Sequence, residues 1–186
     1  MQGLYPVPTS FPRIPCSDAC GTVISVGAKV TRFSVGQKVC TLFNQGHIAG
    51  PFTPAIAGTS LGGSLDGTLR QYAAFPESGL VLAPATLSPI EASTLSCAPV
   101  TAWNSFYGVV DRALRPGDYV LTQGTGGVSI AALQFAIAAG AIVIATTSSA
   151  AKAERLKKLG ARHVINYKEN PNWGAQAKKL TPGGEG

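Results

Sequence analysis

Residues 118–149 read Asp-Tyr-Val-Leu-Thr-Gln-Gly-Thr-Gly-Gly-Val-Ser-Ile-Ala-Ala-Leu-Gln-Phe-Ala-Ile-Ala-Ala-Gly-Ala-Ile-Val-Ile-Ala-Thr-Thr-Ser-Ser. An apolar run, 118–123, leads into a glycine turn, 124–127, and then into an almost wholly apolar segment, 128–139. A second apolar run, 141–146, follows Gly140. We predict strand, turn, helix and strand. Uniformly apolar strands joined by a helix are typical of a parallel sheet buried on both faces.

The pattern continues toward the carboxyl end. Residues 150–159 form an amphipathic segment that Gly160 ends, and 163–166 is a third short apolar run. On the amino-terminal side, 89–109 has apolar residues at helical spacing and predicts two short helices broken near Pro99. Residues 89–186 are therefore predicted to be inter-domain helices followed by part of a doubly wound parallel sheet.

The first 88 residues have a different composition. They are rich in Gly, Pro, Ser and Thr, with short β-type runs at 21–26, 37–43 and 69–75. Turn residues separate these runs at short intervals, which predicts a β-rich, barrel-like domain over 1–88. Residues 44–67 hold six glycines and two prolines and are expected to be a long surface loop. The fold class is thus α/β.

The glycine turn is the first candidate site. It reads Gly124-x-Gly126-x-x-Ser129, a variant of the dinucleotide-binding pattern, between a predicted strand and a predicted helix. Gly124 would permit the turn, and Gly126 would let the backbone approach a pyrophosphate. Amides where the helix begins, at Gly127 and Val128, would face that anion. The alternative is an ordinary turn that binds nothing.

The end of the second strand bears on the choice of cofactor. Sites for NAD usually carry an acidic residue there, about 20 residues after the turn, to hold the ribose hydroxyls. Here the position falls in 146–149, Thr-Thr-Ser-Ser, and Lys152 follows. Hydroxyls of Ser148 and Ser149 and the Lys152 ammonium would accept a 2′-phosphate, which favours NADP. Alternatively, either serine caps the next helix and Lys152 is a solvated surface residue.

Composition excludes several classes of protein. The chain has 186 residues, 45% hydrophobic and 13% charged, which suits one or two folded domains rather than a disordered chain. No apolar run is long enough to span a membrane, and residues 1–6 lack the features of a leader peptide. We expect a cytoplasmic protein with no membrane partner.

Charge and cysteine content exclude further kinds of partner and site. The net charge is +6, with eight Lys/Arg against three acids in 152–186. These bases fall at helical intervals and have no aromatic stacking platform beside them, so nucleic acid is not expected as a partner. The four cysteines form no CxxC pair and are interpreted as buried free thiols.

Several segments together resemble the medium-chain dehydrogenase/reductase superfamily, and within it the zinc-independent quinone oxidoreductase and enoyl reductase branch. They are Ile14-Pro-Cys-Ser-Asp-Ala-Cys-Gly-Thr-Val-Ile-Ser-Val-Gly27, Val30-Thr-Arg-Phe-Ser-Val-Gly-Gln-Lys-Val39, Asp66-Gly-Thr-Leu-Arg-Gln-Tyr72, Leu95-Ser-Cys-Ala-Pro-Val-Thr-Ala-Trp103, Gln123-Gly-Thr-Gly-Gly-Val128 and Leu159-Gly-Ala-Arg-His-Val-Ile-Asn-Tyr167. The resemblance implies a partial GroES-like β-barrel domain followed by a partial Rossmann domain. The pattern of the family is expected to be truncated at both ends of the chain.

The resemblance also assigns roles to residues. It places Lys152 and Tyr167 on the 2′-phosphate of NADPH, and Thr101 near the nicotinamide. Zinc-dependent relatives carry Gly-His-Glu where this chain has Cys16-Ser-Asp18. Although Cys97 matches a cysteine ligand of that branch, three protein ligands are needed. We therefore expect no metal.

Two functions follow as hypotheses. The first is an NADPH-dependent oxidoreductase that transfers hydride to a quinone, enone or other carbonyl compound, with a homodimer among the assemblies the family allows. Its proton donor is unassigned, with Tyr72 and Ser17 as polar candidates. The second is a truncated, non-catalytic chain that binds a nucleotide or a partner.

Overall fold

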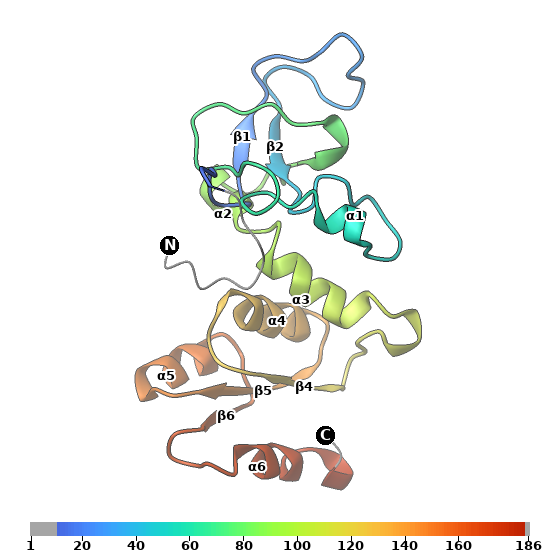
Figure 1. Ribbon diagram of the computed structural model, residues 1–186. Coiled ribbons are helices and arrows are strands. Elements are labelled where there is room, and N and C mark those ends of the chain that lie inside the picture. Colours follow the sequence, from blue (N-terminus) through green and yellow to red (C-terminus); the bar gives the residue numbers. More distant parts are fainter. Residues whose placement is uncertain (1–10, 185–186) are drawn as a thin grey trace. The chain divides into compact units, whose positions relative to one another are not determined.

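The computed structural model describes residues 11–184. The chain divides into two compact units, Met1–Cys97 and Ala98–Gly186, which are described separately (Figure 1). The leader-peptide expectation concerns residues 1–6, which lie outside the described residues. Among residues 11–184, no helix combines the length and the apolar character that crossing a bilayer requires.

A three-stranded parallel sheet organises the second unit. Its strands are β4 (Tyr119–Thr122), β5 (Ile142–Thr147) and β6 (His163–Asn166), in the spatial order β4-β5-β6. Helix α4 (Gly127–Ala138) connects the first two strands and α5 (Ala150–Lys158) connects the last two. The strand–turn–helix–strand prediction for this region is confirmed.

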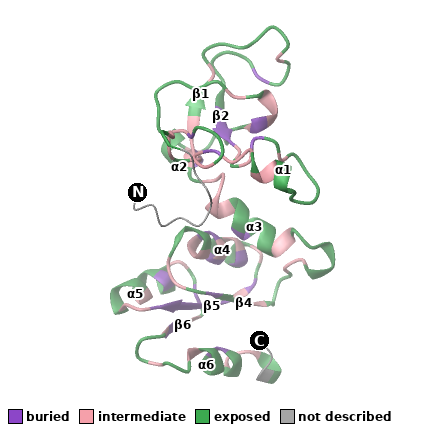
Figure 2. Cartoon of the chain, in the orientation of Figure 1, coloured by how far each residue is buried: buried purple, intermediate pink, exposed green. Residues whose placement is uncertain are grey.

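The central strand β5 is buried on both faces (Figure 2). Because successive side chains of a strand point to opposite faces, β5 contributes to a core cluster on each side of the sheet. Val143 and Ala145 belong to one core cluster, which includes Leu133 of α4 and Leu156 of α5. Ile144 belongs to a second cluster on the opposite face. Helix α6 (Trp173–Lys179) covers that second face.

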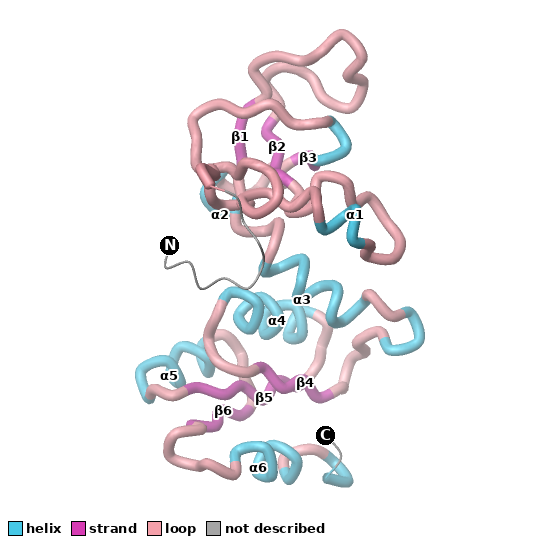
Figure 3. Tube along the Cα trace, in the orientation of Figure 1, coloured by secondary structure: helices cyan, strands magenta, loops and turns pink. Residues whose placement is uncertain are grey.

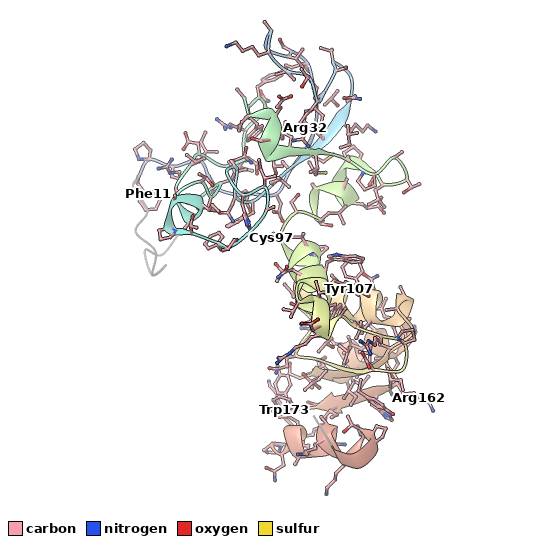
Figure 4. All side chains as sticks on the ribbon, turned by 90° about the vertical axis from the view of Figure 1, so that its right-hand side faces the viewer. Phe11, Arg32, Cys97, Tyr107, Arg162 and Trp173 are labelled. Atoms are coloured by element: carbon pink, nitrogen blue, oxygen red, sulfur yellow. The ribbon has the colours of Figure 1, made fainter. Side chains whose placement is uncertain are left out.

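Helix α6 was not predicted from the sequence. Its Ala177 is buried in the second cluster, where Trp173, labelled in Figure 4, also packs. The basic residues of α5 and α6 lie on exposed faces, as the helical spacing of the charges indicated. Arg155, Lys157 and Lys158 lie in the last turn of α5, where their positive charges interact favourably with the negative end of the helix dipole.

Helix α4 is apolar all round because it is packed on two sides. One side lies against the sheet, and α3 (Ala98–Tyr107) lies along the other. Trp103 of α3 meets Phe135 of α4 edge to face, with ring centroids 5.7 Å apart. The expected break between two helices near Pro99 is confirmed, since α2 (Pro89–Ser93) ends before α3 begins.

The first unit contains a small antiparallel sheet. Its strands are β1 (Cys20–Thr22), β2 (Lys38–Thr41) and β3 (Leu80–Leu82), in the order β1-β2-β3. Helix α2 packs on β1 and β2 and is held by a capping box, in which Ser88 and Glu91 exchange hydrogen bonds. The remaining short helices of the described chain are α1 (Pro54–Ala57), η1 (Glu77–Gly79), η2 (Val110–Arg112) and η3 (Pro182–Gly184).

Two expectations for this unit are wrong. Residues 69–75 form no strand (Figure 3). Backbone pairing reaches only Leu69, whose amide donates to the Pro15 carbonyl. Arg70 then turns back onto Thr68, leaving Leu69 68% exposed. Strand β3 was not predicted. The segment 44–67 is also more structured than a surface loop, because it contains α1 and buries Leu61.

Candidate functional site

The glycine turn is held by the neighbouring strand. Gly124 has a φ of +78°, a conformation that glycine adopts without strain. Its amide donates to the hydroxyl of Thr146, at 3.1 Å between nitrogen and Oγ1. Thr146 is 2% exposed and belongs to β5. The turn after β4 is therefore fixed to the end of β5.

Helix α4 begins without a side-chain cap. Gly126 is its N-cap, with φ −74° and ψ 173°, and no side chain of the described chain caps this end. The Gly126 carbonyl already accepts the first intrahelical hydrogen bond, from Ile130 at 3.0 Å. The first amides of a helix have no partner within it, so those of Gly127 and Val128 are available to a ligand.

The glycines of the turn differ in their surroundings. A Cβ built on Gly126 would meet no atom within 4 Å, whereas one on Gly127 would lie 3.1 Å from the Cβ of Ala98 on α3. Gly126 thus leaves an open space at the helix N-terminus, while Gly127 allows α3 and α4 to pack closely. Ser129, in the third position of the pattern, donates from Oγ to the Gln123 carbonyl at 2.8 Å.

The remaining candidates follow the ends of β5 and β6. The amide of Tyr167 donates to the Thr147 carbonyl at 3.0 Å, which brings the residue after β6 beside the end of β5. The amide of Ser149 donates to Thr147 Oγ1 at 3.3 Å. Ser148 lies between them and is half-buried. Lys152 is exposed, in the first turn of α5.

The structure bears on the capping alternative for the serines. Ser149 is the N-cap residue of α5, but its side chain makes no capping hydrogen bond. Neither α4 nor α5 has an acidic residue in its first turn. Both helix N-termini therefore keep their positive ends without a carboxylate beside them, which suits an anion.

Thr101 belongs to α3, whose first residue packs against the start of α4. It is exposed and stands one helical turn after Ala98, the residue that packs against Gly127. Residues three apart share a helix face, so Thr101 and Ala98 lie on the same side of α3. All nine cofactor candidates thus belong to the second unit.

Thr146 supports the site but is not among the residues predicted from the sequence. The available signal was a polar residue at the end of an otherwise apolar strand. Such a side chain, buried among apolar neighbours, needs a hydrogen-bond partner. The nearby turn amide of Gly124 supplies one.

The residues that match zinc ligands belong to the first unit. Burial raises the pKa of Asp18, partly offset by a hydrogen bond that Ser17 donates to its carboxylate at 3.2 Å. Burial also raises the pKa of the Cys97 thiol, with a contribution from the Asp18 charge. Residues 11–184 contain no group of three or more His, Cys, Asp or Glu side chains that could hold a metal. A catalytic zinc takes about three protein ligands, and residues 11–184 do not bring such a set together.

The proton-donor candidates also lie in the first unit. Ser17 is engaged with Asp18 through its hydroxyl. Tyr72 is 73% exposed and lines a groove of about 620 Å³. Neither observation gives either residue a role in proton transfer.

We expect Asp18→Asn to change how stability depends on pH. The raised pKa of Asp18 in the folded state means that folding favours the protonated acid. This contribution is present below the unfolded-state pKa and is lost as pH rises through the folded-state pKa. The variant should therefore gain free energy of unfolding relative to the wild type between about pH 4 and pH 7, by less than about 1 kcal/mol because the group is only partly buried.

Calorimetric unfolding over this pH range measures the difference. The exposed Asp111→Asn provides a control for the loss of one carboxylate and should show no such trend. A variant that loses stability relative to the wild type as pH rises would contradict the prediction.

Known proteins match both units. The family model described as alcohol dehydrogenase GroES-like domain matches residues 1–85, and that described as zinc-binding dehydrogenase matches residues 127–186. A zinc-type alcohol dehydrogenase-like protein of Schizosaccharomyces pombe is 47% identical over 182 residues, which cover 98% of this chain and 53% of that protein.

Two solved structures are also similar. An NAD-dependent alcohol dehydrogenase aligns with a TM-score of 0.79 and 35% identity, covering 96% of this chain and 53% of the other. An Escherichia coli quinone oxidoreductase complexed with NADPH aligns with a TM-score of 0.70 and 26% identity, covering 98% and 48%. The chain spans about half the length of these relatives.

These matches agree with the architecture of the two units. The antiparallel sheet corresponds to part of a GroES-like domain and the parallel sheet to part of a Rossmann domain, so the α/β fold class is confirmed. Two family models and similar relatives thus lead to one assignment: the chain belongs to the medium-chain dehydrogenase/reductase superfamily.

Proposed function

We propose that the second unit binds NADPH and that the chain is part of an oxidoreductase that reduces a quinone, enone or other carbonyl compound. The observation that carries the proposal is the start of α4. There an uncapped helix N-terminus meets the open space at Gly126. A pyrophosphate is the anion that such a turn accommodates in this fold.

The preference for NADPH over NADH rests on the ends of β5 and β6. Ser148, Ser149, Lys152 and Tyr167 offer hydroxyls and an ammonium, and no acidic residue lies among 146–153 to repel a 2′-phosphate. The relatives are divided on this point, since one is NAD-dependent and another was solved with NADPH. The proposed preference for NADPH therefore rests on these four side chains and not on the relatives.

The bound nicotinamide would supply the hydride, and the protein would supply binding and orientation. Gly124, Gly126, Gly127 and Val128 would hold the pyrophosphate through backbone groups. Thr101 would lie near the nicotinamide. We propose a reaction without zinc, because Ser17, Asp18 and Cys97 do not provide a zinc ligand set.

Calorimetric titration of the whole chain with NADPH and with NADH tests the proposal. In Lys152→Ala we expect NADPH affinity to fall about tenfold, because one charge-assisted contact to the phosphate is lost. NADH affinity should be unchanged. Lys158→Ala removes the same charge from an exposed position in the last turn of the same helix and should bind both like the wild type.

Three results would contradict the proposal. Tighter binding of NADH than NADPH by the wild type would overturn the specificity. An equal loss for both cofactors in Lys152→Ala would remove Lys152 from the phosphate site. Binding of neither would refute the nucleotide site itself.

A chain that binds the nucleotide without turnover is the second candidate. It is favoured by β4, an edge strand in the described sheet whose Leu121 is 42% exposed. Exposed apolar surface of this kind is usually covered in a working domain. Steady-state oxidation of NADPH with a panel of quinones and enones separates the candidates, because only the enzyme consumes NADPH in a substrate-dependent way.

A further inference from the structure

The four cysteines differ in their surroundings, although none of them is in a disulfide. Cys40 is buried, Cys20 and Cys97 are partly buried, and Cys16 is exposed. The expectation of four buried thiols is therefore wrong for Cys16. The nicotinamide proposal assigns no role to any of them.

Cys20 and Cys40 are direct cross-strand neighbours. They face each other in the register of β1 and β2. The Thr41 amide donates to the Ala19 carbonyl at 3.1 Å and the Val23 amide to the Gln37 carbonyl at 2.9 Å. Hydrogen-bonded pairs alternate along an antiparallel ladder, so the cysteines occupy a non-hydrogen-bonded pair.

This position suits a disulfide. Residues at a non-hydrogen-bonded pair have Cα atoms about 4.5 Å apart, and their side chains lie on the same face of the sheet. Disulfides span Cα separations of about 4.4–6.8 Å. The backbone therefore needs little change to join Cys20 and Cys40.

The two thiols already interact. Burial raises the pKa of Cys40 to about 11, together with the charge of Cys20 and a hydrogen bond between the two side chains. The Cys40 thiol also donates to the Ala92 carbonyl of α2 at 3.4 Å. Cys40 is 2% exposed, whereas Cys20 lines the groove of the first unit. An oxidant in solution therefore reaches Cys20 first.

We propose that Cys20 and Cys40 form a reversible disulfide when the chain meets a peroxide. The Cys20 thiolate attacks the peroxide, which yields a sulfenic acid on Cys20 and hydroxide. The Cys40 sulfur then attacks the Cys20 sulfur, and hydroxide leaves as water after taking up the Cys40 proton. Overall, two thiols lose two electrons and two protons, and one molecule of hydrogen peroxide becomes two waters. An added dithiol reverses the reaction by thiol–disulfide exchange.

The other cysteines are less suited to this reaction. Cys16 lies four residues before Cys20, outside the paired strands. Cys97 lies between α2 and α3, outside the strands whose register places Cys20 opposite Cys40. The disulfide would close the loop between β1 and β2, so the oxidised chain should also resist unfolding more than the reduced chain.

The test treats the whole chain with hydrogen peroxide, alkylates the remaining thiols and maps tryptic peptides. We expect a dithiol-sensitive link between peptide 14–29, which holds Cys16 and Cys20, and peptide 39–70, which holds Cys40. In the native chain this link should form at least about tenfold faster than in the urea-unfolded chain, because folding holds the thiols together.

Variants identify the partners. Cys16→Ser should keep the link, and its peptide 14–29 then contains only Cys20. Cys20→Ser should abolish it and leave Cys40 alkylated. A link that persists in Cys20→Ser, that involves Cys97, or that joins two chains would overturn the proposal. So would peroxide treatment of the folded wild type that leaves both thiols free or oxidises Cys20 only to sulfinic acid.

Discussion

Gly126→Ala is expected to weaken NADPH binding at least about 100-fold, or about 2.8 kcal/mol, while the poorer N-cap costs the fold less than about 1 kcal/mol. A Cβ on Gly126 would meet no protein atom within 4 Å, and the φ of −74° suits any residue. The methyl group would instead occupy the space into which the proposed site admits the pyrophosphate. Calorimetric titration and thermal unfolding of the same variant measure the two effects.

Gly174→Ala provides the matched control. Gly174 lies in α6, where a Cβ also meets nothing within 4 Å. The control should bind NADPH like the wild type and gain about 0.5–1 kcal/mol of stability, because alanine favours a helix over glycine. If Gly126→Ala binds as tightly as this control, the open space at Gly126 is not where the nucleotide binds.

Leu133→Ala is expected to lower the free energy of unfolding by about 2–5 kcal/mol, the range for deleting a fully buried leucine. Leu133 is 0% exposed and packs in the cluster that α4 and α5 form with the sheet, alongside Val143 and Leu156. The lost transfer free energy and the cavity left among these side chains both contribute.

Tryptophan fluorescence during urea unfolding measures this loss in the second unit alone. The chain has two tryptophans, Trp103 and Trp173, and both belong to that unit. Ile137→Ala removes a similar side chain one turn later in α4, where it is 38% exposed, and should cost clearly less. Equal losses in the two variants would show that Leu133 is not the centre of this core.

The second unit could be predicted because each element carries its own signal. The strands β4 and β5 are apolar runs ended by turn residues, and α4 begins at Gly127 and ends just before Gly140. Local pattern and tertiary environment agree best at β5, which is buried on both faces, whereas Leu121 of β4 is 42% exposed. Helix α6 was not predicted, because a short segment with few apolar residues becomes a helix through Trp173 and Ala177 packing on the sheet.

The first unit could be predicted less well because its structure depends on pairing between distant segments. Residues 69–75 have a strand-like composition, yet beyond Leu69 they pair with no strand of the described chain. Leu80–Leu82 becomes β3 because β2 is available at that register, with Cys40 opposite Val81. The composition of a segment does not show which sheet edge is available for it to pair with.

The candidate site was predictable to the level of which residues share an edge. Parallel strands bring their carboxyl ends together, so Gly124, Ser149 and Tyr167 had to meet once the strands were identified. What the sequence could not supply was the packing role of Gly127 against Ala98 and the hydrogen bond from Gly124 to Thr146. Both depend on side chains from other elements. The cofactor preference and the boundary between 1–88 and 89–186 remain predictions.

The position of β5 has a consequence for how the site can change. The strand is paired along both edges and covered on both faces, so its amide hydrogens should be among the last of the second unit to exchange with deuterium. The proposed phosphate ligands Ser148, Ser149 and Lys152 come directly after this slowly opening strand, at partly or fully exposed positions. Mutation can therefore exchange one cofactor preference for another at the surface, while the backbone that positions those side chains stays as rigid as the core.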